Sequence, residues 1–144
     1  MPVLFDSSIY IQALRRSGDV PPLWMRWAGK EPVWLSAVVL HELYLGSKAG
    51  DRRIIGKLEY DFGRAGRMLV PNLGDWVKAG TMLAHLARKY GYERIGRARL
   101  TNDALIAVSA ARAGIEVITA NRRDFAALSE FCPLRWQERM DFGN

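Results

Sequence analysis

The sequence TNDALIAVSAARAGIEVITANRRDF, residues 101–125, predicts a helix followed closely by a strand. Small and apolar residues over Thr101–Ala113 predict the clearest helix of the chain, with Thr101 or Asn102 as its N-cap and Gly114 as its left-handed end. The apolar run Val117–Thr119 then predicts a short buried strand. A helix next to such a strand is typical of a domain in which the two alternate.

The same alternation extends over the rest of the chain. Strands are predicted at Val3–Phe5, Val33–Leu35, Met68–Val70 and Val117–Thr119, with an edge strand at Leu134–Trp136. Helices are predicted at Ser7–Arg16, Leu23–Gly29, Ser36–Leu45 with Ser36 as N-cap, within Lys48–Arg67, and at Trp76–Tyr90, Thr101–Ala113 and Phe125–Phe131. This order predicts a three-layer α/β/α fold with a mainly parallel sheet of four or five strands. The length of 144 residues and 49% hydrophobic composition fit one domain over residues 1–144.

Composition narrows the class of protein. A single cysteine, Cys132, excludes an intramolecular disulfide framework, and with only two histidines a Cys/His zinc site is not expected. No run of about 18 apolar residues predicts a membrane span, so a cytoplasmic protein is expected. The net charge of +6 is compatible with a polyanionic partner such as nucleic acid, or with a merely soluble basic surface.

Four acidic residues, Asp6, Glu42, Asp103 and Asp124, stand at or near the ends of predicted apolar runs. In parallel α/β sheets the carboxyl ends of the strands form the crevice where ligands bind, so acids from distant positions can meet there. Clustered carboxylates need a cation, and an all-oxygen site suits Mg²⁺ or Mn²⁺. The pattern therefore predicts a divalent metal site.

Each acid also has a structural explanation when it is considered alone. Asp6 and Asp124 can cap the helices that follow them, and Asp103 suits the positive end of a helix dipole. Glu42 can be a rim carboxylate held by an arginine. Against these explanations, Glu42 falls within the apolar stripe of its helix, and Asp103 is on the predicted buried face.

Four segments of the chain resemble the PIN-domain nucleases, especially the VapC toxins of prokaryotic toxin–antitoxin pairs. These segments are Leu4–Ser8, the helix that carries Glu42, Thr101–Ala107 and Thr119–Phe125. The resemblance implies that Asp6, Glu42 and Asp103 belong to the acidic metal site. For the fourth position we favour Asp124, with Asn121 beside it holding a metal-bound water, although these two roles can be reversed.

The predicted chemistry is RNA phosphodiester hydrolysis by a water activated at the carboxylate-bound Mg²⁺ or Mn²⁺. Ser7, Ser8, Thr101, Thr119 and Asn121 are predicted to orient the carboxylates and waters. RNA contacts are predicted for Arg97, Arg99, Arg122 and Arg123 in the neighbouring basic loops, for which solvated loop charge and antitoxin contact are alternatives. The resemblance further implies a VapB-like antitoxin that occludes the site and a homodimer.

Two other functions fit parts of the pattern. A receiver-like or phosphatase-like domain also uses clustered acids and Mg²⁺, but no suitable lysine lies near the later predicted strands. The second alternative is a catalytically silent RNA-binding PIN module, and the presence of all four acids argues against this alternative.

Overall fold

The computed structural model describes residues 1–17, 32–91 and 98–139, and in them it forms one parallel sheet. The strands are β1 (Val3–Phe5), β2 (Val33–Ser36), β3 (Met68–Leu69), β4 (Glu116–Thr119) and β5 (Trp136–Glu138). Their order across the sheet is β3-β2-β1-β4-β5, and every pairing is parallel. The predicted parallel sheet is confirmed, with five strands.

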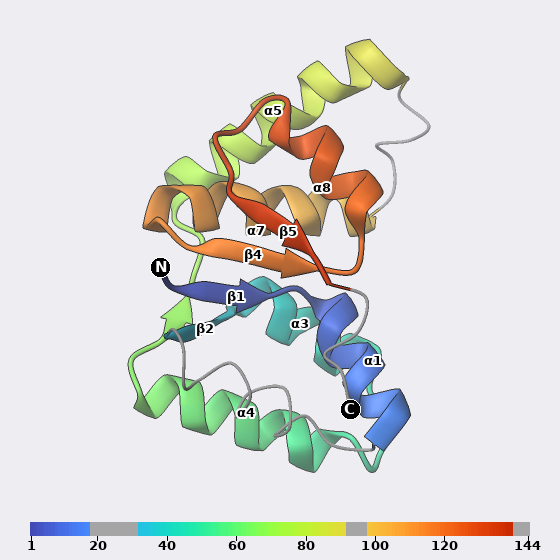
Figure 1. Cartoon of the computed structure of the whole chain (residues 1–144), viewed down its shortest axis with the longest axis vertical. Helices are drawn as coiled ribbons and strands as arrows, with labels where there is room; N and C mark the ends of the chain where they lie inside the picture. The colour runs from blue at the N-terminus through green and yellow to red at the C-terminus, as the bar shows by residue number, and fades with distance from the viewer. Residues whose placement is uncertain (18–31, 92–97, 140–144) are drawn as a thin grey trace.

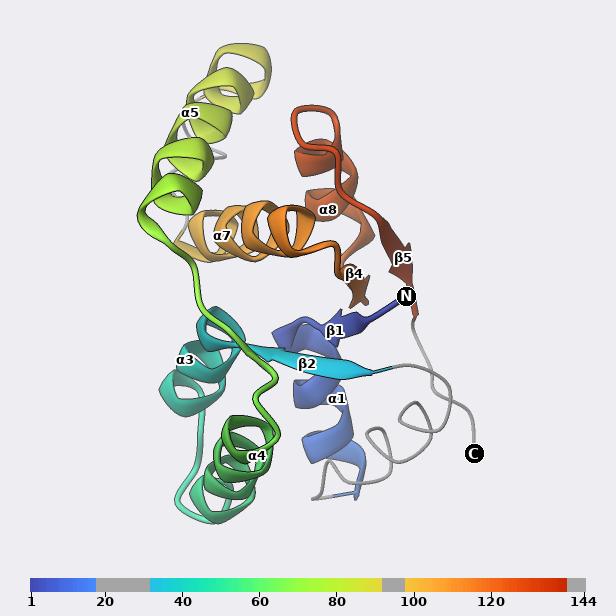
Figure 2. The ribbon, with the colours of Figure 1, turned by 90° about the vertical axis from the view of Figure 1, so that its left-hand side faces the viewer.

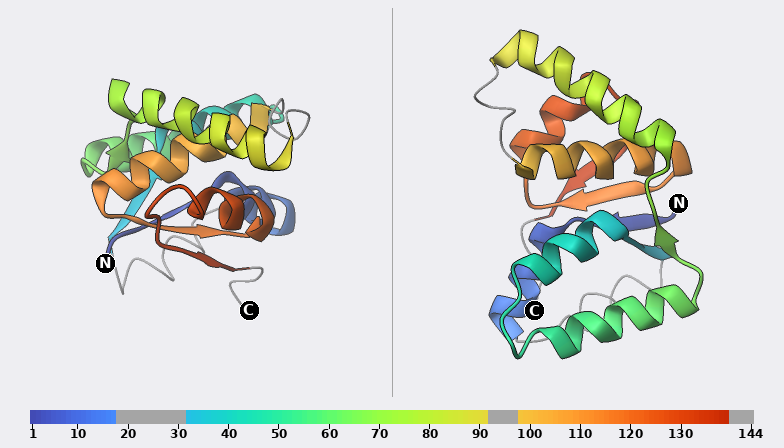
Figure 3. Two further views of the ribbon diagram at one scale, coloured as in Figure 1. Left: turned by 90° about the horizontal axis from the view of Figure 1, so that it is seen from above. Right: turned by 180° about the vertical axis from the view of Figure 1, so that it is seen from behind.

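Helices connect the strands and pack beside them (Figure 1). They are α1 (Ser7–Ser17), α3 (Ala37–Leu45), α4 (Arg52–Arg64), α5 (Leu73–Tyr90), α7 (Ala98–Ala113) and α8 (Arg122–Ser129). Helix α7 packs on β4 and α8 on β5, and α5 packs on these two helices. Helices α3 and α4 pack on β2, whereas α1 contacts both β1 and β4. Helices α5 and α7 run beside each other in all views (Figure 2, Figure 3).

Strands β1 and β4 lie side by side at the middle of the sheet, and the chain adds its other strands outward from this pair in opposite directions. The chain moves from β1 through β2 to β3 toward one edge, and from β4 to β5 toward the other. Since crossovers between parallel strands are right-handed, this reversal of direction between β1 and β4 places helices on both faces of the sheet and gives the expected three layers. It also leaves a crevice at the carboxyl ends of β1 and β4, where ligands bind in such folds.

The core is apolar on both sides of the central strands. The side chains of Leu4, Phe5, Leu35, Val117 and Ile118 are fully buried. Strands that are covered on both faces read as continuous apolar runs, which is why these segments were recognisable. Each such side chain contributes roughly 1.5–3 kcal/mol by leaving water.

Helices α7 and α8 begin earlier than predicted. Helix α7 begins at Ala98, so Thr101 and Asn102 lie inside it and neither is its N-cap. Helix α8 begins at Arg122 because the Asn121 side chain accepts a hydrogen bond from the backbone of Asp124. Asp124 therefore lies in the first turn of α8, which excludes the alternative explanation that it caps this helix, and the predicted start of the helix at Phe125 is wrong.

Other boundaries follow from local hydrogen bonds. Ser36 is confirmed as the N-cap of α3, and Gly114 has the left-handed φ of 70° expected after a helix. Helix α5 begins at Leu73 rather than Trp76, because Asn72 and Asp75 form a reciprocal capping box. Helix α4 stays continuous despite its glycines.

The last elements also shift by a few residues. Strand β5 starts at Trp136, where the predicted strand ended, and α8 ends at Ser129. The predicted helix Leu23–Gly29 lies outside the described residues. No helix of the described part of the chain has the length and apolar character needed to cross a bilayer.

Candidate active site

Asp6 lies at the reversal point of the sheet, between the end of β1 and the start of α1. It is 2% exposed, and its backbone N–H donates to the carbonyl of Ile118 in β4. One carboxylate oxygen accepts hydrogen bonds from the backbone N–H and the hydroxyl of Ser8. The other accepts a 2.6 Å hydrogen bond from Thr119 Oγ1. The Ser8 backbone contact is also the helix-capping contact of the alternative explanation for Asp6.

The electrostatic state of Asp6 reflects competition between burial and hydrogen bonding. Burial raises the pKa of Asp6, and the hydrogen bonds from Ser8 and Thr119 oppose that rise only in part. A neighbouring cation would favour the ionised form of such a carboxylate. Perturbed carboxyl groups of this kind are common at functional sites.

The turns after β1 and β4 are tied together by two hydroxyl groups. Ser8 Oγ donates to Asp6 and accepts from the backbone N–H of Ala120 at 3.1 Å. Thr119 Oγ1 donates to Asp6 and accepts from the backbone N–H of Asn121 at 2.8 Å. Each hydroxyl therefore bridges the carboxylate to the turn after β4, which fixes the position of Asp6 relative to Asn121.

Asn121 brings two further acids together. Its amide nitrogen donates to Asp124 Oδ2 at 2.8 Å and lies 3.4 Å from Asp103 Oδ2. Asp103 is 3% exposed in the first half of α7, whereas Asp124 is half-buried in the first turn of α8. The amide therefore stands between two carboxylates that would otherwise repel each other.

Glu42 reaches the same edge of the sheet from α3. This half-buried side chain accepts a 3.2 Å hydrogen bond from Ser7 Oγ, the residue directly after Asp6. The contact joins the start of α1 to the middle of α3, two helices that pack together. His41, the preceding residue, is exposed on another face of α3.

The donors around this crevice suit a hard divalent cation. They are carboxylate, amide and hydroxyl oxygens, which Mg²⁺ and Mn²⁺ prefer to sulfur or imidazole ligands. Within the described residues, no three Asp, Glu, His or Cys side chains stand close enough to form a preassembled metal cluster. The acids are instead connected through Ser7, Ser8, Thr119 and Asn121, and a cation would replace some of these hydrogen bonds.

The remaining predicted residues lie around this network or outside the described residues. Thr101 is half-buried in α7, and among the described residues its hydroxyl does not join the network. Arg122 and Arg123 are exposed in the first turn of α8. Arg97 lies outside the described residues, and Arg99 lies in the first turn of α7.

The sequence did not identify one part of the network, the backbone N–H of Ala120 that binds Ser8. A main-chain donor leaves no signature in residue type. The pairing of Ser7 with Glu42 was also missed, because it joins residues 35 positions apart. Only the strand order, which places α1 beside α3, would have pointed to it.

Comparisons with known proteins agree with the fold. A family model described as the PIN domain matches residues 3–130. The solved structure of DNA-bound VapBC from Salmonella typhimurium is 20% identical, covers 96% of this chain and 98% of that chain, and has a TM-score of 0.67. VapBC-1 from nontypeable Haemophilus influenzae is 24% identical with the same coverages and a TM-score of 0.63.

A third structure, VapBC-5 from Mycobacterium tuberculosis, is described as a member of the VapBC family of toxin–antitoxin systems. It is 25% identical, covers 96% of this chain and 98% of that chain, and has a TM-score of 0.52. No curated protein sequence matches the chain. These likenesses extend over nearly the whole length of both partners.

Proposed function

The chain belongs to the PIN-domain family, and from this membership we propose that it is a metal-dependent endoribonuclease of the VapC type, the toxin of a toxin–antitoxin pair. One observation carries the proposal. Asp6, Asp103 and Asp124 are connected through Thr119 and Asn121 at the reversal point of the sheet. Such a crevice is where this class of fold binds its ligand.

We assign Asp6, Glu42, Asp103 and Asp124 as the residues that hold the metal, Mg²⁺ or Mn²⁺. When bound, such an ion supplies a hydroxide nucleophile at neutral pH and stabilises negative charge on a phosphodiester. Ser8 and Thr119 orient Asp6, and Ser7 orients Glu42. Asn121 donates to both Asp103 and Asp124, and we assign it the role of holding a water beside them.

RNA is the substrate that we propose. The net charge of +6 favours a polyanion, and Arg122 and Arg123 lie on the first turn of α8 beside Asn121 and Asp124. These arginines are suited to hold phosphates next to the scissile bond. The proposed metal-holding residues come from a turn and three helices that connect the strands of one five-stranded sheet, which supports a single domain over residues 1–144.

The partners that we propose are a VapB-like antitoxin and a second copy of the chain. Three of the solved structures described above are VapBC structures, which supports the first. An exposed apolar stripe on α5 supports the second, because Leu73, Trp76 and Val77 are 79%, 56% and 62% exposed at one-turn spacing. An RNA substrate and such an antitoxin are consistent with a cytoplasmic location.

Digestion of RNA by the purified protein tests the proposal. Structured RNA, single-stranded DNA and duplex DNA are incubated with Mg²⁺ or Mn²⁺, with and without EDTA. We expect cleavage of RNA that stops on chelation and is absent in Asp103→Asn. Preference for either DNA, or cleavage that survives EDTA, would contradict the mechanism. Binding of RNA without any cleavage would favour a silent RNA-binding module.

A further inference from the structure

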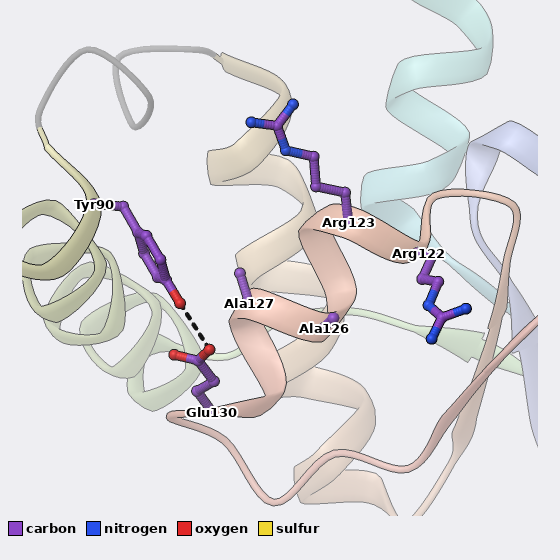
Figure 4. Close-up of a pocket in the computed structure, with 6 residues that line it drawn as sticks. All are labelled: Tyr90, Arg122, Arg123, Ala126, Ala127 and Glu130. Atoms are coloured by element: carbon purple, nitrogen blue, oxygen red, sulfur yellow. Dashed lines mark hydrogen bonds between the residues drawn. The ribbon is translucent and has the colours of Figure 1, made fainter.

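A groove lies between the end of α5 and helix α8, directly beside the proposed active site. It has a volume of about 430 Å³ and is lined by Tyr90, Arg122, Arg123, Ala126, Ala127 and Glu130 (Figure 4). None of these residues holds the proposed metal. The two arginines precede Asp124 in the first turn of α8, so one end of the groove begins at the site.

The lining follows one face of α8. Arg123, Ala126, Ala127 and Glu130 stand at positions i, i+3, i+4 and i+7, which share a side of a helix. The two alanines give this face a low apolar floor between a cationic end and a carboxylate. A chain passing over the first turn of α8 can therefore continue along the helix without meeting a bulky side chain.

Contacts between α5 and the end of α8 fix the far wall of the groove. Glu130 accepts hydrogen bonds from Tyr90 Oη and from Lys89 Nζ, each at 2.7 Å. His85 and Phe131 stack nearby with ring centroids 5.7 Å apart. The Lys89 ammonium also lies 5.2 Å from the centroid of the Tyr90 ring. The aromatic ring of Tyr90 is thus held at the groove wall, with positive charge next to it.

We infer that this groove binds the single-stranded RNA nucleotide next to the scissile phosphate, with one backbone phosphate on each of Arg122 and Arg123 and the base against Tyr90 over the alanine floor. The inference rests on the proposed nuclease function. Positive charge that tracks the backbone, combined with an aromatic ring that stacks a base, is the usual means of holding single-stranded nucleic acid. A duplex does not offer an unpaired base to such a wall.

Binding measurements test the groove without relying on catalysis. The probe is a fluorescein-labelled single-stranded RNA of roughly ten nucleotides, measured by anisotropy in EDTA in the Asp103→Asn background. Tyr90→Ala is expected to raise Kd roughly tenfold, whereas Tyr90→Phe, which keeps the ring, changes Kd less than about twofold. Ala126→Glu, which adds a negative charge to the floor and removes no contact, is expected to weaken binding by a similar factor to Tyr90→Ala. Circular dichroism confirms that each variant is folded.

Salt dependence and crosslinking provide two further readouts. Replacing Arg122 and Arg123 with alanine should reduce the slope of log K against log salt by about 1.4, because each phosphate contact on a single strand contributes about 0.7. Replacing Arg52 and Arg53, two adjacent exposed arginines in the first turn of α4, with alanine is the matched charge control and should reduce the slope by less. Ultraviolet crosslinking of a 4-thiouridine RNA should map to the peptide that contains Tyr90.

Unchanged affinity in both Tyr90→Ala and Ala126→Glu, or crosslinks confined to other peptides, would overturn the inference even if the protein cleaves RNA. Conversely, crosslinking at Tyr90 and the expected affinity losses in a protein that fails to cleave RNA with Mn²⁺ would support the groove and refute the nuclease assignment. A single-stranded DNA probe of matched sequence tests whether the groove binds RNA specifically or any single-stranded nucleic acid. Equal affinity for DNA would overturn the RNA specificity.

Discussion

Thr119 Oγ1 donates a 2.6 Å hydrogen bond to Asp6 Oδ2, joining residues that are 113 positions apart in the chain. The bond connects the carboxyl ends of β1 and β4, the neighbouring strands between which the sheet order reverses. The same hydroxyl accepts from the backbone of Asn121 and so connects Asp6 to the residue that holds Asp103 and Asp124. The Thr119 hydroxyl thus fixes the position of Asp6 relative to Asn121, which contacts the other two aspartates.

Thr119→Val tests this relationship, because valine keeps the buried shape and removes the hydroxyl. Asp6 loses a donor that lowers its pKa, so its ionised form becomes less favourable. We expect Mn²⁺ affinity, measured by calorimetry, and the rate of RNA cleavage each to fall about 10- to 100-fold. Unfolding free energy should fall by about 1–2 kcal/mol, since the Asn121 N–H loses its acceptor.

The matched control is Thr81→Val on α5. Thr81 Oγ1 donates to the carbonyl of Val77 on the exposed side of that helix, far from the acids in sequence. This control should leave metal affinity and cleavage unchanged. Equal metal affinities of Thr119→Val and wild type would show that the hydroxyl does not support the site.

Asp103→Asn separates metal binding from stability. Removing one of several neighbouring carboxylates relieves repulsion, so the metal-free protein should unfold at the same or slightly higher temperature. The increase in Tm on adding Mn²⁺ should shrink strongly, because the variant binds the ion less tightly. Thermal denaturation with and without metal measures both effects. The same metal-induced shift in variant and wild type would exclude Asp103 from the site.

Asn121→Asp tests the position between Asp103 and Asp124. A third carboxylate there would replace an amide donor 2.8 Å from Asp124 Oδ2 with a like charge. Without metal the variant should lose about 1–3 kcal/mol of stability at pH 7, and the loss should shrink below about pH 4 as carboxylates protonate. Stabilisation by added Mn²⁺ should exceed that of wild type. A loss of stability that does not change with pH would point to packing rather than charge.

The toxin assignment predicts an effect on growth. Expression of the chain alone should arrest bacterial growth, and co-expression of the product of a neighbouring antitoxin gene should relieve the arrest, because the partner occludes the acidic crevice. The Asp6→Asn/Asp103→Asn double variant should be harmless at equal expression. Undiminished arrest in that variant would show that toxicity comes from another part of the molecule.

The sequence predicted the succession of strands and helices along the chain better than it predicted where the helices begin and end. Continuous apolar runs such as Val3–Phe5 reveal buried parallel strands because both faces are covered. The beginnings of α7 and α8 were misplaced because several polar residues in each segment can serve as caps, and propensity does not rank them. Asn121 rather than Asp124 is the N-cap of α8, because the Asn121 side chain accepts a hydrogen bond from the backbone N–H of Asp124.

The residues of the candidate site were predictable from the sequence, whereas the hydrogen bonds that join them were not. Acids at strand ends are visible in the sequence, whereas the pairing of Ser7 with Glu42 depends on how α1 packs on α3. The groove of Tyr90 and Glu130 was likewise invisible, since these residues are 40 positions apart and follow no sequence motif. Tertiary packing, rather than local preference, decides such contacts.

The ion pair of buried Asp75 with the exposed Arg112 predicts a pH-dependent contribution to stability. Asp75 is 2% exposed at the start of α5, and Arg112 Nε lies 3.0 Å from both of its oxygens. Burial raises the pKa of Asp75, but hydrogen bonds from Arg112 and the Asn72 backbone outweigh it and hold the pKa below 3.8. Because the folded pKa is depressed, the stabilisation is present above about pH 4 and is lost as pH falls through the folded value.

Arg112→Met removes the cation and keeps much of the aliphatic side chain, leaving Asp75 buried with its capping contacts alone. We expect a loss of about 1–3 kcal/mol at pH 7, measured by urea unfolding, because a buried carboxylate loses its strongest donor. The difference from wild type should narrow as the pH is lowered from 5 toward 3, since a protonated Asp75 no longer needs the cation. Lys57→Met is the control, because the Lys57–Asp61 pair on α4 is exposed and is worth at most about 0.5 kcal/mol. A constant difference between Arg112→Met and wild type over this pH range would assign the loss to packing of the arginine stem rather than to its charge.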